Sequence, residues 1–275
     1  MSTTQRKGLE SRHYTFIGLA IVVIVTMAIG YEPEVPASPD TLKMYQMIED
    51  LPEGSVLMVS FDHEASSLPE IRPLALALLR HAFERDMRLI GTALLAEGTG
   101  VGYGLMRQVA AEYGKRYGTD YVYLGFRPQY IAAILSMGES IPATFPEDYL
   151  GEPYLSYPML RGIESYDDIA GVISVTDGSM TVHWVEYGNG QYGVPISAFV
   201  TAAMVTTYDP YLSSGQLVSI VGGLRGAAEY EQLIGIGGSG ARGMLAQTSS
   251  HLYVILLIII GNVIYFANRR KGRRR

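Results

Sequence analysis

The chain has 275 residues, a formal net charge of −6 and no cysteine. The lack of cysteine excludes disulfides, thiolate metal sites and cysteine nucleophiles, so any domain outside the cytoplasm must be held together by its core alone. Twenty tyrosines against one tryptophan favour partly wet interfaces, because tyrosine combines apolar area with a polar tip.

The charge is unevenly distributed along the chain. Residues 1–13 carry a net charge of +2 and residues 268–275 carry +6, whereas the remainder carries 12 Lys+Arg against 26 Asp+Glu, a net −14. A segment this acidic repels the phosphate backbone of a nucleic acid, so we expect no nucleic-acid partner.

Two uncharged apolar stretches, residues 16–29 (FIGLAIVVIVTMAI) and 252–267 (LYVILLIIIGNVIYFA), lie next to these basic ends. Roughly 17–25 apolar residues cross a bilayer, and basic residues stay on the cytoplasmic side. We therefore expect a cell-membrane protein with spans at 14–30 and 251–267, and with cytoplasmic tails at 1–13 and 268–275. The membrane lipid is then a partner, and the acidic middle lies outside the cytoplasm.

Three alternatives remain open for these ends. Each short stretch is also compatible with a buried core helix, and the first with a signal peptide cleaved near Val35-Pro36-Ala37. The arginine-rich tail is interpreted as a topology anchor, although capture of anionic lipid headgroups or of a nucleic acid would use the same charges. Asn262 indicates association within the membrane, because an amide in the bilayer needs a hydrogen-bond partner on a neighbouring helix. Gly261 beside it, and Gly18 in the first stretch, would permit close helix contact.

The middle of the chain has the pattern of an α/β protein. Residues 31–50 predict a spacer followed by a helix at 42–49, capped by Asp40 or Thr41. Within the predicted domain (51–234) five apolar strands alternate with helices, which is typical of a Rossmann-like or flavodoxin-like, mostly parallel sheet. Residues 142–166 are predicted to be an irregular lid or interaction loop, and 235–250 a glycine-rich linker. The strands are expected at 55–61, 88–96, 120–126, 169–176 and 194–201, and the helices at 68–85, 105–117, 129–137, 180–192 and 216–233.

Polar residues follow the predicted strands, where ligands bind to such sheets. Asp62, Glu97 and Asp177 are expected at one rim, where three carboxylates would suit Mg²⁺ or Ca²⁺. The alternative is that these residues only mark strand exits and cap the next helices. The full set of candidate ligand-binding residues is Asp62, Glu64, Glu97, Gly100, Gly102, Asp177, Ser179 and Thr201.

The glycine-rich segment 98–104 (GTGVGYG) is predicted to be a turn that precedes the helix at 105–117. Backbone N–H groups there could hold a phosphate, but the segment lacks the G-x-G-x-x-G and G-K-[ST] patterns. Residues 235–240 match G-x-G-x-x-G by letter, but they follow a helix and are interpreted as linker. The sequence contains no G-x-S-x-G nucleophile elbow, and its histidines do not have the spacing of metal ligands. Neither pattern therefore supports a catalytic role.

Several phrases resemble an uncharacterised family of prokaryotic membrane-anchored proteins. They are SFD at 60–62, YGTDY at 117–121, SGQL at 214–217, GGLRGAAEY at 222–230, and the closing span with His251, Gly261 and Asn262. The resemblance implies an α/β domain between two terminal spans and carries no activity.

The leading hypothesis is a membrane-anchored, non-enzymatic structural or assembly component. Its acidic domain would mediate protein–protein association, with copies of itself or with other membrane proteins, and no cofactor is expected. The alternative hypothesis is a ligand- or cation-binding domain, hydrolytic in one version, that uses the Asp62, Glu97 and Asp177 rim. A third hypothesis is a sensor that needs a cytoplasmic partner.

Overall fold

The computed structural model describes residues 11–31 and 33–272. It divides the chain into two compact units, Glu34–Gly240 and the combined ends Met1–Pro33 and Ala241–Arg275. The first unit is an α/β domain, and the second contains the two long apolar helices. Most of the predicted N-terminal tail (1–10) and the last three residues of the basic tail lie outside the described residues, as does Glu32.

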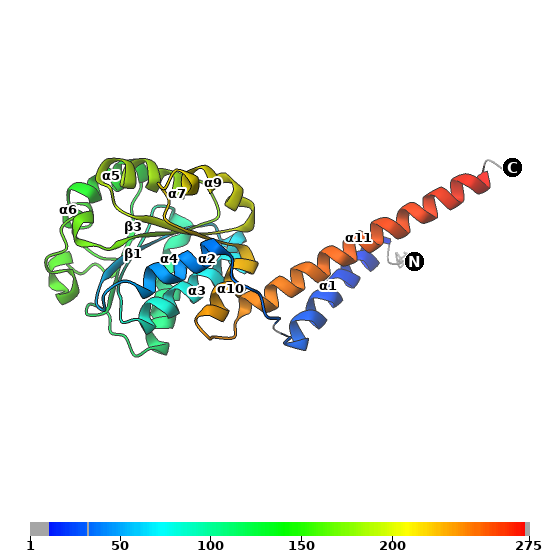
Figure 1. The fold of residues 1–275 in the computed structure, drawn as a ribbon, viewed down its shortest axis with the longest axis horizontal. Coiled ribbons are helices and arrows are strands. Elements are labelled where there is room, and N and C mark those ends of the chain that lie inside the picture. Colours follow the sequence, from blue (N-terminus) through cyan, green and yellow to red (C-terminus); the bar gives the residue numbers. More distant parts are fainter. Residues whose placement is uncertain (1–10, 32, 273–275) are drawn as a thin grey trace, which may run out of the picture. The chain divides into compact units, whose positions relative to one another are not determined.

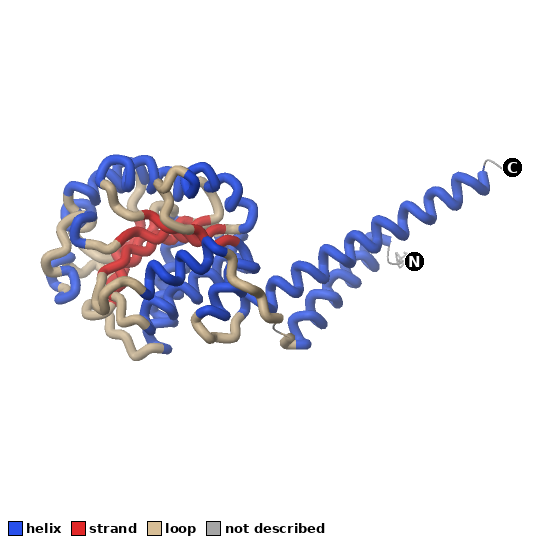
Figure 2. The backbone as a smooth tube through the Cα atoms, in the orientation of Figure 1, coloured by secondary structure: helices blue, strands red, loops and turns tan. Residues whose placement is uncertain are grey.

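Six parallel strands form the sheet of the domain, between two layers of helices (Figures 1 and 2). Their order is β3-β2-β1-β4-β5-β6, so the direction of winding reverses between β1 and β4. The α/β class and parallel sheet expected from the sequence are confirmed, because strands that are apolar on both faces need helices on both sides. The strands are β1 (Val56–Asp62), β2 (Arg88–Ala93), β3 (Tyr121–Phe126), β4 (Gly171–Thr176), β5 (Ile196–Val200) and β6 (Ile220–Gly222).

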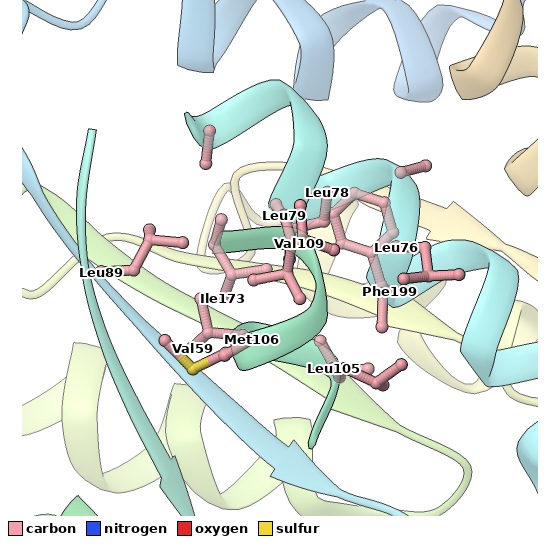
Figure 3. Packing of buried hydrophobic residues seen from close by; sticks show 14 of the residues in the cluster. Val59, Leu76, Leu78, Leu79, Leu89, Leu105, Met106, Val109, Ile173 and Phe199 are labelled. Atoms are coloured by element: carbon pink, nitrogen blue, oxygen red, sulfur yellow. The ribbon is translucent and has the colours of Figure 1, made fainter. Parts of the chain in front are cut away.

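One face of the sheet is covered by α2, α3, α4 and α10 (Figure 1). Alternate residues of β1 point to this face, and its core combines them with leucines of α3 and with Leu105, Met106 and Val109 of α4 (Figure 3). The helices span Pro39–Glu49 (α2), Leu68–Glu84 (α3), Ala96–Glu112 (α4) and Gly223–Leu233 (α10), and a 3₁₀ turn η1 (Ala65–Ser67) precedes α3.

The opposite face is covered by shorter elements around the fully buried Trp184 and Tyr208. The predicted helix at 180–192 is α7, a π-helical segment η5 and α8 in succession. The predicted irregular segment 142–166 contains most of α6 and the short 3₁₀ turns η2 and η3, and it is otherwise irregular. These elements are α5 (Tyr130–Glu139), α6 (Ile141–Thr144), η2 (Tyr154–Ser156), η3 (Pro158–Leu160), η4 (Tyr166–Asp168), α7 (Met180–His183), η5 (Trp184–Asn189), α8 (Gly190–Tyr192), η6 (Ala202–Met204) and α9 (Val205–Ser213).

At the end of the domain one sequence expectation is wrong and one helix was not predicted. The helix predicted from residue 216 begins only at Gly223, and the three-residue strand β6 precedes it. Helix α9 was not predicted from the sequence. Its Pro210 and threonines disfavour a helix, but the fully buried Tyr208 fixes the segment against the sheet, since tertiary packing overrides propensity.

The predicted glycine-rich turn at 98–104 is also wrong, because these residues form the first turns of α4. Glycines four residues apart share one face of a helix. A Cβ atom at Gly98 would overlap the carbonyl oxygen of Phe61 in β1, and one at Gly102 would overlap the Phe61 ring, whereas Gly100 and Gly104 have open space around them. The inner pair of glycines therefore lets α4 approach the backbone of β1.

Helix α2 is joined to α10 by hydrogen bonds. Its N-cap is Ser38, followed by Pro39, and not Asp40 or Thr41 as predicted, which agrees with the preference for Pro at the first helical position. The buried carboxylate of Glu229 accepts from Ser38 N at 3.0 Å and from Thr41 Oγ1 at 2.8 Å. These bonds hold the segment that follows the first apolar helix on the domain.

The second unit contains α1 (Ser11–Ile29) and α11 (Ser239–Gly272) side by side (Figure 1). Residues 12–29 and 239–267 are long and apolar enough to cross a membrane. The phenol of Tyr253 lies directly over Gly18 and donates to the carbonyl of Thr15 at 3.3 Å. The linker predicted at 235–250 is short, because α11 is already helical at Ser239; only residues 235–238 separate it from Ile234, the C-cap of α10.

We expect Gly98→Ala to destabilise the domain by about 1–3 kcal/mol, because the methyl group has no room against the backbone of β1. Gly100→Ala in the same helix should instead stabilise it by up to about 1 kcal/mol, since alanine is the better helix former. Denaturant unfolding in mild detergent, followed by fluorescence of the single, fully buried Trp184, measures both. Equal effects of the two substitutions would refute the close approach.

Candidate functional site

The reversal of strand order between β1 and β4 is where open α/β sheets usually bind ligands. Here the segments that follow the two strands are bonded to each other. The N–H of Glu64 donates to Asp177 Oδ2 at 3.0 Å, and Thr176 Oγ1 donates to the carbonyl of Asp62 at 2.7 Å. These bonds hold the two strand exits together across the switch point.

Asp62, the first predicted site residue, is fully buried at the end of β1. Its carboxylate accepts from Ser60 Oγ and from Leu94 N, both at 2.6 Å, and from Trp184 Nε1 at 3.4 Å. Burial raises the pKa of Asp62, and the hydrogen bonds oppose that rise. The side chain thus joins β1, the exit of β2 and the π-helical segment after β4.

The other two predicted metal ligands are placed differently. Glu97 is exposed in the first turn of α4, and Asp177 is partly exposed and bound to the backbone of Glu64. Among residues 11–31 and 33–272, no group of three or more His, Asp or Glu side chains is arranged to hold a metal ion. The three carboxylates expected to share Mg²⁺ or Ca²⁺ therefore do not come together in the structure. Asp62 is buried, and its oxygens accept hydrogen bonds inside the core.

The remaining predicted residues have local structural roles. Ser179 is the N-cap residue of α7, and Thr201 is the N-cap residue of η6, neither with a side-chain capping bond. Gly102 of α4 packs against the ring of Phe61, whereas Gly100 faces open space. Only Glu64 and Asp177 of the predicted set are linked directly.

A hairpin covers the free edge of β3, at the end of the sheet. Asp148 N donates to Glu152 O and Tyr154 N to Pro146 O, both at 2.9 Å, and Tyr149 N donates to Tyr123 O of β3 at 3.0 Å. We call residues 145–155 the edge hairpin. Its position saturates a carbonyl that an edge strand would otherwise expose.

Asp148 organises this hairpin. Its nearly buried carboxylate accepts from the phenols of Tyr117 and Tyr157 and from the N–H groups of Leu150 and Glu152. Burial, followed by the bond to Asp148, raises the pKa of both phenols. They stay protonated donors, so the network persists at neutral pH and keeps the hairpin in one conformation.

A cavity of about 330 Å³ opens between the hairpin and the carboxyl end of β3. Its wall includes Arg127, whose guanidinium lies 4.9 Å from the ring centroid of Phe145. Arg127 forms no ion pair with any described residue, and its buried Nε has no hydrogen-bond partner. Glu147 and Asp148 line the same cavity, but among the described residues neither forms an ion pair with Arg127. The guanidinium therefore remains available to an acidic group from another molecule.

Large apolar side chains are exposed on the cavity wall, at Phe126 and Tyr149, and elsewhere on the edge hairpin, at Leu150 and Leu155. We call this set the hairpin surface. Aromatic residues and arginine are enriched at the cores of protein interfaces. Its members, with their exposed fractions, are Phe126 (38%), Tyr149 (44%), Leu150 (52%) and Leu155 (65%).

The sequence pointed to residues 142–166 as a lid or interaction loop, but not to Asp148 or Arg127 as its key residues. The available signals were Gly151, which has the positive φ of 83° that a hairpin tip needs, and the density of tyrosines. No protein-family model, curated protein or solved structure matches this chain.

Asp62→Asn tests the buried carboxyl. The folded state keeps the proton of Asp62 at a pH where the unfolded chain has released it. The unfolding free energy of the native chain should therefore fall as pH rises from about 4 through the raised pKa. The Asn variant should lack this decline, whereas the control Asp177→Asn should retain it. Denaturation midpoints read from Trp184 fluorescence at several pH values measure the difference, and a pH-independent difference would contradict the raised pKa.

Proposed function

We propose that this chain is a two-span cell-membrane protein whose domain lies outside the cytoplasm. Two helices long and apolar enough to cross a bilayer support this, and their most apolar windows are not buried within the described chain. The basic ends, with +2 before the first stretch and +6 after the second, fit two cytoplasmic termini. The acidic domain then lies on the outer side.

We further propose that the domain is Rossmann-like. The order β3-β2-β1-β4-β5-β6 supports this assignment over a flavodoxin-like one, whose order differs. The role proposed is association and not catalysis. It is supported by the engagement of Asp62 in internal hydrogen bonds and by the bonds that join the strand exits of β1 and β4.

The proposed function is that of a structural or assembly component that forms homo-oligomers through the hairpin surface. The observation that carries it is Arg127, which forms no ion pair with the described residues and lines one cavity with the exposed Tyr149. Tyrosine and arginine dominate interface energetics. A second copy supplies the complement, because the segment between the two basic ends has 26 Asp+Glu against 12 Lys+Arg. An exposed carboxylate of one domain would bind Arg127 of the next.

Cysteine labelling tests the topology, since the chain has no cysteine of its own. A membrane-impermeant maleimide should label Ser213→Cys, an exposed position of the domain, in intact cells. Arg275→Cys in the basic tail should react only after permeabilisation. The opposite pattern would invert the proposed orientation, and labelling of both in intact cells would refute two cytoplasmic ends.

Replacing Leu150 and Leu155 by Ser should weaken association of the full chain roughly tenfold, the loss typical of removing interface anchors. Light scattering of the chain in mild detergent over a concentration series should then show a smaller particle than the native chain. The control is Leu42→Ser, which removes an exposed leucine of α2, and Trp184 fluorescence verifies folding. An unchanged mass for the double variant would overturn the role of the hairpin surface.

A further inference from the structure

Asn262 lies in the second apolar helix, α11. Among the described residues its side-chain amide has no hydrogen-bond partner. Arg269 follows seven residues later, or about 10 Å along the helix. If Arg269 lies at the headgroups, as the proposed two-span topology requires, Asn262 lies inside the hydrocarbon, where an unpaired amide is costly.

The contact between α1 and α11 fixes which face of α11 is occupied. Tyr253 packs on Gly18, and between 246 and 257 reduced exposure recurs every three or four residues, at Ala246, Ser249, Ser250, Tyr253 and Leu257. This spacing is one stripe of a helix, and its small and hydroxyl-bearing residues are those that membrane helices use for close packing.

Asn262 is on the opposite face. It follows Tyr253 by nine residues, and at roughly 100° per residue it is turned about 180° from the stripe that contacts α1. A concave surface borders this face, lined by Ile259, Asn262, Val263, Phe266 and Ala267. At roughly 100° per residue, Ile259, Asn262 and Phe266 are the members turned away from the stripe that contacts α1. The spacing of 259, 262 and 266 alternates three and four residues, which is the pattern of a helix that packs against another.

We propose that this outer face of α11 binds the same face of α11 in a second copy of the chain, with the two Asn262 amides hydrogen-bonded across a two-fold axis. An amide has both a donor and an acceptor, so it complements itself. A second copy carries the matching amide at the same depth, because both copies are positioned by the same basic tail. The inference rests on the proposed two-span topology and names the surface through which the homo-oligomer forms in the membrane.

Single cysteines test the pairing in the full-length chain, which otherwise has none. Ile259→Cys lies towards Asn262, whereas its neighbour Ile260→Cys is turned to the side of α1 at the same depth. Under mild oxidation in native membranes, Ile259→Cys should form disulfide-linked dimers at least about fivefold more than Ile260→Cys, because the bond needs Cα atoms within about 7 Å. Adding Asn262→Leu to Ile259→Cys should lower the dimer fraction about threefold.

Three results would overturn the proposal. They are equal crosslinking at the two positions, no effect of Asn262→Leu, and crosslinks of Ile259→Cys only to a protein of different mass. Alkaline extraction separates the failure of this inference from that of the proposed function. A chain that stays in the membrane but does not crosslink loses only the Asn262 pairing, whereas a chain released by alkali loses the two-span topology as well.

Discussion

The domain depends on one buried carboxyl group at the end of its central strand. Asp62 receives hydrogen bonds from the exit of β2 at Leu94 and from Trp184 in the segment after β4, so a single side chain joins three consecutive parts of the sheet. Burying such a group is costly unless its oxygens are satisfied, and here both are. Near the switch point the carboxyl edge is held by these internal bonds, and the features proposed above for recognition are at the sheet edge and on α11.

A second carboxylate, Asp148, has the complementary role at the sheet edge. It holds a surface segment in place through four donors, so Tyr149 and Leu150 are presented from a fixed hairpin. Association through a preorganised surface loses less conformational entropy than association through a loop that must first become ordered. Part of the tyrosine excess of the sequence is used here, where Tyr117 and Tyr157 pack against each other and both donate to Asp148.

The strands β1 to β5 were predictable because their apolar runs have no helical period. Three features were not. The strand β6 has only three residues, too few to show a pattern. The glycines of α4 resemble a turn unless their four-residue spacing is recognised as a helix face packed on Phe61. The sequence predicted Asp62 as an exposed carboxylate at the carboxyl edge of the sheet, because it does not show that Trp184 and Leu94 donate hydrogen bonds to it. Likewise the sequence alone does not show that Arg127 has no ion-pair partner among the described residues.

The two proposed contacts differ in symmetry, and this difference determines what they build. Pairing of α11 through Asn262 uses the same face on both copies, so it is isologous and closes at a dimer. Binding of a carboxylate by Arg127 joins unlike groups, so it closes at a dimer only where the pair is reciprocal across a two-fold axis. Repeated head to tail, it is heterologous and leaves a free Arg127 at one end and a free carboxylate at the other. In that arrangement the dimers joined in the membrane are linked further through their domains, and each contact raises the effective concentration for the other. The assembly is then an array in the plane of the membrane, and loss of the Arg127 contact reduces it to dimers.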